Sequence, residues 1–144
     1  MKHLKLALIL ILFSVQSVWA ESFTFIGDWI DGQGTPNKVY IDSDNIKKNG
    51  NFRMVLIFYN YPLKGTGEEL SHVAKYEYDC YQEVRKRKSW AKYSEPFGKG
   101  EMTRAGNDDG TSFGERWFRV AMGPNDPNPG ARISIKIMNI ICDK

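Results

Sequence analysis

The sequence has few of the residues from which metal and redox sites are usually built. Among its 144 residues there are two cysteines and two histidines, and no CxxC motif. A structural zinc site needs four ligands, usually cysteine or histidine, and a thioredoxin-like redox site needs the CxxC motif. Both kinds of site are therefore disfavoured, and we expect neither a metal nor another cofactor.

The sequence also lacks the parts of a hydrolytic site. After residue 20 the single imidazole that could act as a base is His72, which follows Ser71 directly. Adjacent residues of a strand point to opposite faces, so these two side chains do not form a nucleophile–base pair. A small hydrolase is thus a poor alternative, and we expect a protein that is not an enzyme.

Only one long apolar run is present, and it lies at the N-terminus. A basic start precedes the run from Leu6 to Val15, and the small residues Val18 and Ala20 follow it. This order is typical of a signal peptide, so we expect cleavage after residue 20 and one domain over 21–144. A membrane anchor is the alternative, but a spanning helix needs roughly 20 apolar residues. We therefore expect no transmembrane segment after cleavage.

The expected export limits the locations in which the mature protein could be found. No cysteine lies near the expected cleavage site to carry a lipid, so a periplasmic, secreted or cell-surface location is open. Removing the signal leaves 18 basic against 17 acidic residues. A nucleic-acid-binding domain usually has a strong basic excess, so we expect no nucleic-acid partner.

The expected export also indicates the role of the two cysteines, Cys80 and Cys142. Disulfides persist in exported proteins, and two cysteines allow one intramolecular pairing. Closing the 62-residue separation would stabilise the fold by roughly 4 kcal/mol in the chain-entropy model. The alternative is a pair of free buried thiols.

Most of the chain from Ser22 to Val120 has the pattern of antiparallel strands. Asn49 and Gly50 mark a tight turn, and the apolar strand after it is expected to be covered on both faces. The segments 71–80 and 83–93 predict a hairpin, with Cys80 pointing inward. A loop is expected from about Gly98 to Gly114, and a last strand over 115–122.

The C-terminal segment is open to two interpretations. Isoleucines alternate with polar residues up to Lys136, as they would in a strand. A helix would instead begin near Asn128 and Pro129 and would keep one narrow polar stripe. The alternation stops at Lys136 whereas the helical pattern continues to the end, which favours the helix.

A dense basic run in the second half of the hairpin is the main candidate for partner binding. In a strand its arginines would face one way and its lysines the other, and a matrix glycan or an acidic protein surface could use either pair. Aromatic residues nearby could add contact area. The alternative is a solvated hairpin whose lysines discourage edge-to-edge pairing and whose aromatic rings pack on the sheet. The candidate residues are Arg85, Lys86, Arg87, Lys88, Trp90 and Tyr93.

An ordered series of motifs resembles the surface-adhesin protein E-like domain of exported bacterial proteins. The series runs through nearly the whole chain after residue 20, and its order and spacing are more specific than any single motif. It consists of Tyr40-Ile41-Asp42, Ile46, Gly50, a strand ending near Tyr59, Tyr78-Asp79-Cys80, the basic run, Tyr93, Gly98-Lys99-Gly100, Trp117 and Cys142.

The resemblance implies an α+β fold with a single antiparallel sheet of about six strands. A C-terminal helix would pack on one face and be tied to the sheet by a Cys80–Cys142 disulfide. It also implies binding to host extracellular-matrix or serum proteins, and association as a homodimer. The family's namesake is a lipoprotein, whereas no cysteine here could carry the lipid. A periplasmic or envelope-associated accessory protein that binds a bacterial partner is therefore the alternative function.

Overall fold

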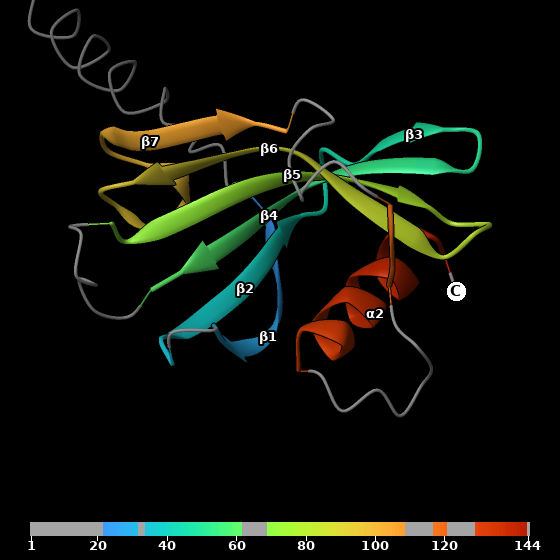
Figure 1. Cartoon of the computed structure of the whole chain (residues 1–144), viewed down its shortest axis with the longest axis horizontal. Coiled ribbons are helices and arrows are strands. Elements are labelled where there is room, and N and C mark those ends of the chain that lie inside the picture. The colour runs from blue at the N-terminus through green and yellow to red at the C-terminus, as the bar shows by residue number, and fades with distance from the viewer. Residues whose placement is uncertain (1–21, 32–33, 62–68, 109–116, 121–128, 144) are drawn as a thin grey trace, which may run out of the picture.

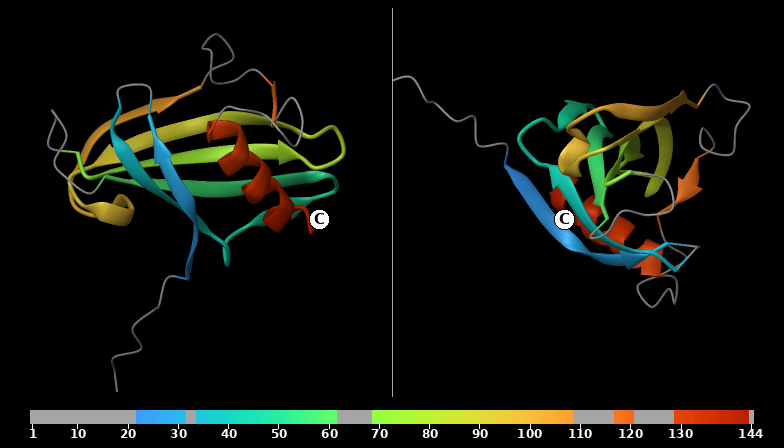
Figure 2. Two further views of the ribbon diagram at one scale, coloured as in Figure 1. Left: turned by 90° about the horizontal axis from the view of Figure 1, so that it is seen from below. Right: turned by 90° about the vertical axis from the view of Figure 1, so that its left-hand side faces the viewer.

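The computed structural model describes residues 22–31, 34–61, 69–108, 117–120 and 129–143, so the expected signal peptide lies outside the described residues. In that part of the chain an antiparallel sheet with the strand order β1-β2-β4-β5-β6-β7 curls into a half-barrel, and one helix packs on its inner face (Figures 1 and 2). The elements are β1 (Phe23–Ile30), β2 (Pro36–Asp42), β3 (Lys47–Asn49), β4 (Phe52–Asn60), β5 (Ser71–Asp79), β6 (Val84–Tyr93), the short 3-10 helix η1 (Pro96–Gly98), β7 (Met102–Asn107), β8 (Phe118–Arg119) and α2 (Pro129–Ile141).

The C-terminal segment is the helix α2, which confirms the favoured interpretation. Ile137 and Ile141 are buried to 0% and 1% exposure, one turn apart on the face that meets the sheet. Lys136 and Asn139 lie on the exposed side, within the polar stripe that the helical pattern predicted. Burial of a continuous apolar face explains why isoleucine, usually a strand former, is accommodated in a helix here.

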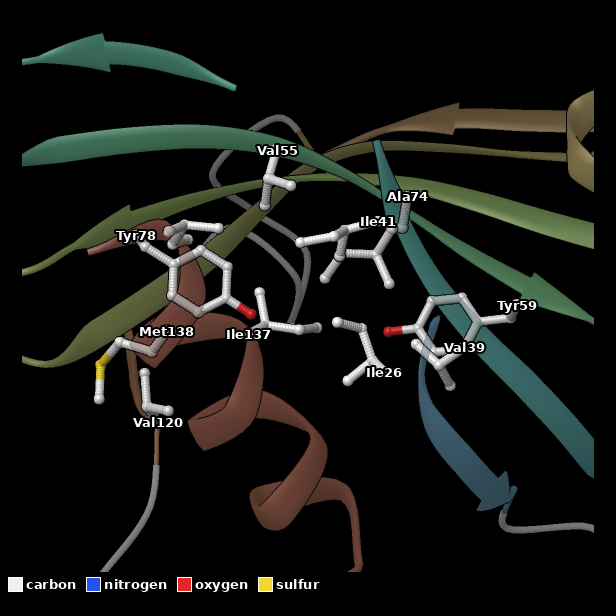
Figure 3. Packing of buried hydrophobic residues seen from close by; sticks show 12 residues of the cluster. Ile26, Val39, Ile41, Val55, Tyr59, Ala74, Tyr78, Val120, Ile137 and Met138 are labelled. Carbon is white, nitrogen blue, oxygen red and sulfur yellow. The ribbon is translucent and has the colours of Figure 1, made fainter. Parts of the chain in front are cut away.

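The core lies between the inner face of the sheet and α2 (Figure 3). Branched aliphatic side chains from β1, β2 and β4 meet the helix, because alternate residues of each strand point to the same face. The buried cluster contains Ile26, Val39, Ile41, Val55, Ile57, Tyr59, Ala74, Tyr78, Val120, Ile137, Met138 and Ile141.

The C-terminal end of α2 is fastened to the sheet in two ways. The disulfide between Cys80 and Cys142 joins the end of β5 to the residue after the helix, with the two Cα atoms 5.7 Å apart. Beside it, the Arg53 Nε donates a hydrogen bond to the carbonyl of Ile141 at 3.1 Å. A cation at this position also interacts favourably with the helix dipole. The predicted disulfide is therefore confirmed.

The outer face of the sheet has a smaller aromatic cluster under η1. Phe97 stacks on Phe23 with ring centroids 4.6 Å apart, and Phe23 also contacts Phe58 of β4. Gly98 has φ +70° and a Cβ there would lie 2.9 Å from Val73 Cγ2, so glycine is required for this close approach. Strand β4 is thus covered on both faces, as its apolar pattern predicted.

One element departs from the sequence prediction. The loop expected from about Gly98 to Gly114 contains the strand β7, which pairs with β6. Most of β7 is exposed, so it has no apolar alternation that could have identified it. Gly106 sits against the indole of Trp90, where a Cβ would lie 2.8 Å from Nε1, and this explains a glycine inside a strand.

Candidate functional site

The basic run lies in the interior of the sheet. Strand β6 pairs with β5 on one side and with β7 and β8 on the other. All ten of its residues are half-buried. On the second side β7 pairs with Ser89 to Tyr93 and β8 pairs with Val84 and Arg85, so no described strand lies beside Lys86 and Arg87 there. That the lysines discourage edge-to-edge pairing therefore stays a prediction.

The register of β5 and β6 divides the basic residues between the two faces. Arg85 pairs with Tyr78 and Arg87 with Tyr76, and both arginines lie on the inner face. Lys86 pairs with Glu77 on the outer face. The register shifts by one residue beyond this point, so that Lys88 is the extra residue of a β-bulge.

Two of the inner basic side chains already have acidic partners. Arg87 donates to both carboxylate oxygens of Asp108, at 2.7 and 3.0 Å, and the Asp108 side chain is almost fully buried. This hydrogen bond raises the pKa of Arg87. Farther along the strand, Lys92 Nζ lies 2.6 Å from Glu69 Oε2. Both pairs are partly shielded from water, so they hold these positive charges in place.

Arg85 differs from these residues because its neighbours are tyrosines. Its guanidinium carbon lies 4.9 Å from the centre of the Tyr76 ring, in a cation–π contact. Burial alone would lower the pKa of Arg85, but Tyr78, Tyr76 and Tyr59 outweigh it and raise the pKa. Among the described residues no carboxylate forms an ion pair with Arg85.

Tyr78 places a further polar group beside that guanidinium. The Tyr78 side chain is fully buried, and its hydroxyl makes no regular hydrogen bond within the described part of the chain. Burial is the main cause of its raised pKa. Figure 3 shows the hydroxyls of Tyr59 and Tyr78 pointing into the interior of the core cluster. The Arg85 guanidinium interacts with this hydroxyl, so the inner face holds a partly buried cation beside a buried tyrosine hydroxyl.

His72 lies on the same face and is held neutral. Its ring lies between those of Tyr59 and Trp90, with centroids 5.4 and 5.9 Å away. Burial, and to a smaller extent the nearby charge of Arg87, lower the pKa of His72 to about 4. Ser71 is directed elsewhere: its hydroxyl donates to the carbonyl of Glu95 at 2.6 Å. The pair Ser71 and His72 is thus not arranged for nucleophilic catalysis.

The outer face carries an exposed aromatic patch that we define by Phe52, Lys86 and Trp117. The two rings are 6.1 Å apart, and Lys86 Nζ lies 4.6 Å above the Trp117 ring. Phe52 is 39% exposed and Trp117 is 41% exposed. Lys86 is also 3.2 Å from Glu77, which fixes its position beside the tryptophan. Sequence reasoning singled out Lys86 but missed both rings as binding residues.

The remaining candidates take part in packing. The Trp90 indole covers Gly106, and Tyr93 packs near Gly98 at η1. The carbonyl of Lys88 accepts a hydrogen bond from the backbone of Asp108. Of the six predicted residues, Lys86 is the one that the structure joins to exposed aromatic rings.

The described residues contain neither a metal-binding cluster of acidic, histidine or cysteine side chains nor a membrane-spanning helix. No group of three or more histidine, cysteine, aspartate or glutamate side chains in these ranges could hold a metal ion. Nor does any described helix have the length and apolar character needed to cross a membrane.

Comparison with known proteins gives one match. The family model of surface-adhesin protein E matches residues 28–143, a span that includes both cysteines, β2 to β8 and α2. No curated protein and no solved structure matches the chain.

Proposed function

We propose that this chain, which belongs to the surface-adhesin protein E family, is a non-enzymatic exported protein that adheres to a protein partner. Its main support within the structure is the aromatic patch of Phe52, Lys86 and Trp117, with two large rings exposed beside a positioned lysine. Aromatic residues are enriched at protein interfaces, because their rings bury a large apolar area at low entropic cost.

The surroundings of the patch suit adhesion to a folded partner. Tyr81 lies in the β5–β6 turn and is 81% exposed, more than any other large apolar side chain of the described residues. That turn is joined to the turn before β4 by the hydrogen bond from the backbone of Cys80 to Asn51. The nearby disulfide stabilises both turns, so a partner would meet a surface that is already ordered.

Binding to immobilised host matrix and serum proteins tests the proposal. We expect the purified mature chain to bind at least one of them, and Trp117→Ala to weaken that binding by about tenfold or more, as for a central aromatic contact. Lys86→Ala should have a smaller effect, since the lysine is already paired with Glu77.

Met102→Ala is the matched control, because Met102 is 56% exposed on β7 and lies outside the patch. If Trp117→Ala binds as tightly as the unchanged chain, the patch is not the adhesive surface. An Arg85→Ala/Arg87→Ala variant tests the other half of the basic run. Selective loss of partner binding in that variant would move the proposed contact to the inner face.

Location decides between host adhesion and the alternative of a periplasmic or envelope-associated accessory protein. Host adhesion predicts that a protease added to intact cells cleaves the mature protein. If intact cells protect the protein and only the periplasmic extract contains it, the accessory role replaces adhesion. A homodimer, the other proposed partner state, predicts a concentration-dependent mass in sedimentation equilibrium.

A further inference from the structure

The turn between β3 and β4 contains the one asparagine–glycine pair of the sequence. Asn49 ends β3 and pairs with Phe52, and Gly50 begins the two-residue turn between them with φ +55°. A type II′ turn prefers glycine at this position, because glycine has no Cβ to hinder a positive φ. The same lack of a side chain leaves the Gly50 backbone nitrogen unhindered next to the side-chain amide of Asn49.

The described part of the chain shields neither of these two groups. Asn49 and Gly50 are both exposed, and a Cβ built on Gly50 would have no heavy atom within 4 Å apart from its chain neighbours. Within the described ranges, neither the Asn49 side chain nor the Gly50 N–H makes a hydrogen bond. The carbonyl carbon of the side-chain amide and the backbone nitrogen that follows it are therefore both accessible to water and to each other.

Strand β3 holds this turn weakly. It has three residues, all of them exposed, and it pairs with β4 alone. Figure 1 shows β3 and the beginning of β4 as a hairpin at one end of the sheet. A short exposed strand of this kind opens locally at a low free-energy cost. Such an opening lets Asn49 leave its extended conformation, so that its Cγ can approach the Gly50 nitrogen.

Several other described asparagines are buried or held by hydrogen bonds. Asn37 and Asn60 are 1% and 9% exposed, so water has little access to their side chains. Asn45 is exposed, but its Nδ2 donates a hydrogen bond to Asp42 Oδ2 at 2.8 Å. These three side chains are therefore less able to react than that of Asn49.

At the remaining described asparagines the following residue is unfavourable. Asn51 and Asn139 are exposed, but bulky phenylalanine and isoleucine residues follow them and hinder the approach of the backbone nitrogen. After Asn107, the N–H of the next residue already donates to the carbonyl of Lys88 at 3.0 Å. Asn49 is thus the described asparagine that combines exposure, an unbonded side chain and an unhindered neighbouring nitrogen.

We propose that Asn49 is a site of spontaneous deamidation. The Gly50 nitrogen gives its proton to a solvent base and forms a bond to Asn49 Cγ. The Cγ–Nδ2 bond breaks, the leaving nitrogen takes a proton from water, and ammonia departs as a succinimide ring closes. Water then opens either carbonyl of the ring, which gives aspartate or isoaspartate at this position. Water is the only co-reactant, and asparagine is among the chemically labile side chains.

The isoaspartate product would disturb the adjacent strand pair. It adds one methylene to the backbone, so the pairing of Asn49 with Phe52 cannot keep its register. The same turn is joined to the β5–β6 turn by the hydrogen bond from the Cys80 N–H to the Asn51 carbonyl. We therefore expect isoaspartate to loosen β3 and to move Phe52 relative to Trp117.

Incubation of the purified mature chain at mildly alkaline pH and physiological temperature, followed by peptide mass spectrometry, tests the proposal. We expect the acid form to accumulate at Asn49 faster than at any other described asparagine. Fragmentation that distinguishes the two products should find both isoaspartate and aspartate, because the succinimide opens at either carbonyl. The rate should rise with pH, since the attacking nitrogen must lose its proton.

Two variants assign the reaction to the proposed atoms. Asn49→Gln should abolish conversion at this position, since its longer side chain must close a larger and less favourable ring. Asn51→Gln is the matched control, because it replaces an exposed asparagine of the same turn and should leave the rate at Asn49 unchanged. Far-UV circular dichroism confirms that each variant is folded. NMR of the β3 amides and of the Trp117 indole compares the fresh chain with the converted one.

Several results would overturn the proposal. These are equal conversion at Asn51, aspartate without isoaspartate, a rate that does not rise with pH, or an unchanged folded chain after an incubation that converts Asn49 in the urea-unfolded chain. None of these measurements involves a binding partner, so this site and the proposed function fail independently.

Discussion

The inner face of the sheet has two regions that differ in the kind of side chain they carry. On β1, β2 and β4 the inner face is lined with aliphatic side chains that pack against α2. On β5 and β6 the same face carries tyrosines, Arg85, Arg87 and His72. Apolar packing is sufficient to explain the first region. The second keeps partly buried charges, of which Arg87 and Lys92 are paired with acids while Arg85 contacts a tyrosine ring.

Removing the disulfide between Cys80 and Cys142, which joins the end of β5 to the residue after α2, should lower the unfolding free energy the most. We expect the double variant Cys80→Ala/Cys142→Ala to lose about 4 kcal/mol of unfolding free energy, because its unfolded chain is no longer cross-linked. Denaturant unfolding measures the change, and reduction of the unchanged protein should reproduce most of it. A loss below about 1 kcal/mol would show that packing alone holds α2 in place.

A cavity in the apolar region should lower the unfolding free energy by nearly as much. Ile137→Ala removes a fully buried side chain between α2 and the sheet, and we expect a loss of about 3 kcal/mol. Ile140→Ala is the control on the same helix, since Ile140 is 38% exposed and should cost well under 1 kcal/mol beyond any change in helix propensity. Equal effects of the two substitutions would contradict the assigned helix face.

Acid should destabilise the polar region through His72. Its folded-state pKa of about 4 is below the unfolded value, so the unfolded chain takes up the proton first. The stability contributed by neutral His72 is present above pH 6.5 and is lost as the pH falls toward 4, by about 2–3 kcal/mol.

His72→Phe isolates this contribution, because a phenyl ring can still pack against Tyr59 and Trp90 but does not titrate. The difference in unfolding free energy between the unchanged protein and the variant should shrink or reverse sign on acidification from pH 7 to pH 4. A difference that stays constant over that interval would mean that His72 is protonated equally in both states.

Replacing Arg85, which has no acidic partner among the described residues, should have the smallest effect on the unfolding free energy. We expect Arg85→Met to change the unfolding free energy by less than about 1 kcal/mol, or to raise it, since a buried charge is replaced by an apolar side chain of similar length. The parallel variant Arg87→Met should be destabilised by a few kcal/mol, because it removes the cation of the ion pair that the buried Asp108 side chain makes. Similar losses in both would remove the distinction between the two arginines.

Local patterns predicted the framework because they are properties of single segments. Alternation identified the β5–β6 hairpin, Asn49-Gly50 identified the turn between β3 and β4, and a continuing polar stripe identified α2. Strand β7 was missed, since an exposed edge strand needs no apolar face.

The candidate site was harder to predict because it depends on long-range pairing. The basic run was found as a cluster of charge, but the acids that neutralise Arg87 and Lys92 lie about twenty residues away in the sequence. Likewise, Phe52 and Trp117 meet only after the sheet has formed. Sequence reasoning therefore identified the charges without showing which of them are paired with acids.

The most direct test of the division of the inner face is a crystal structure of the mature chain. We predict that the Arg85 guanidinium lies beside Tyr76 and Tyr78 without a carboxylate from the described residues, while Ile137 packs among aliphatic side chains between α2 and the sheet. If a carboxylate of those residues pairs with Arg85, or if aliphatic side chains surround it, the two regions are not distinct and the account is contradicted.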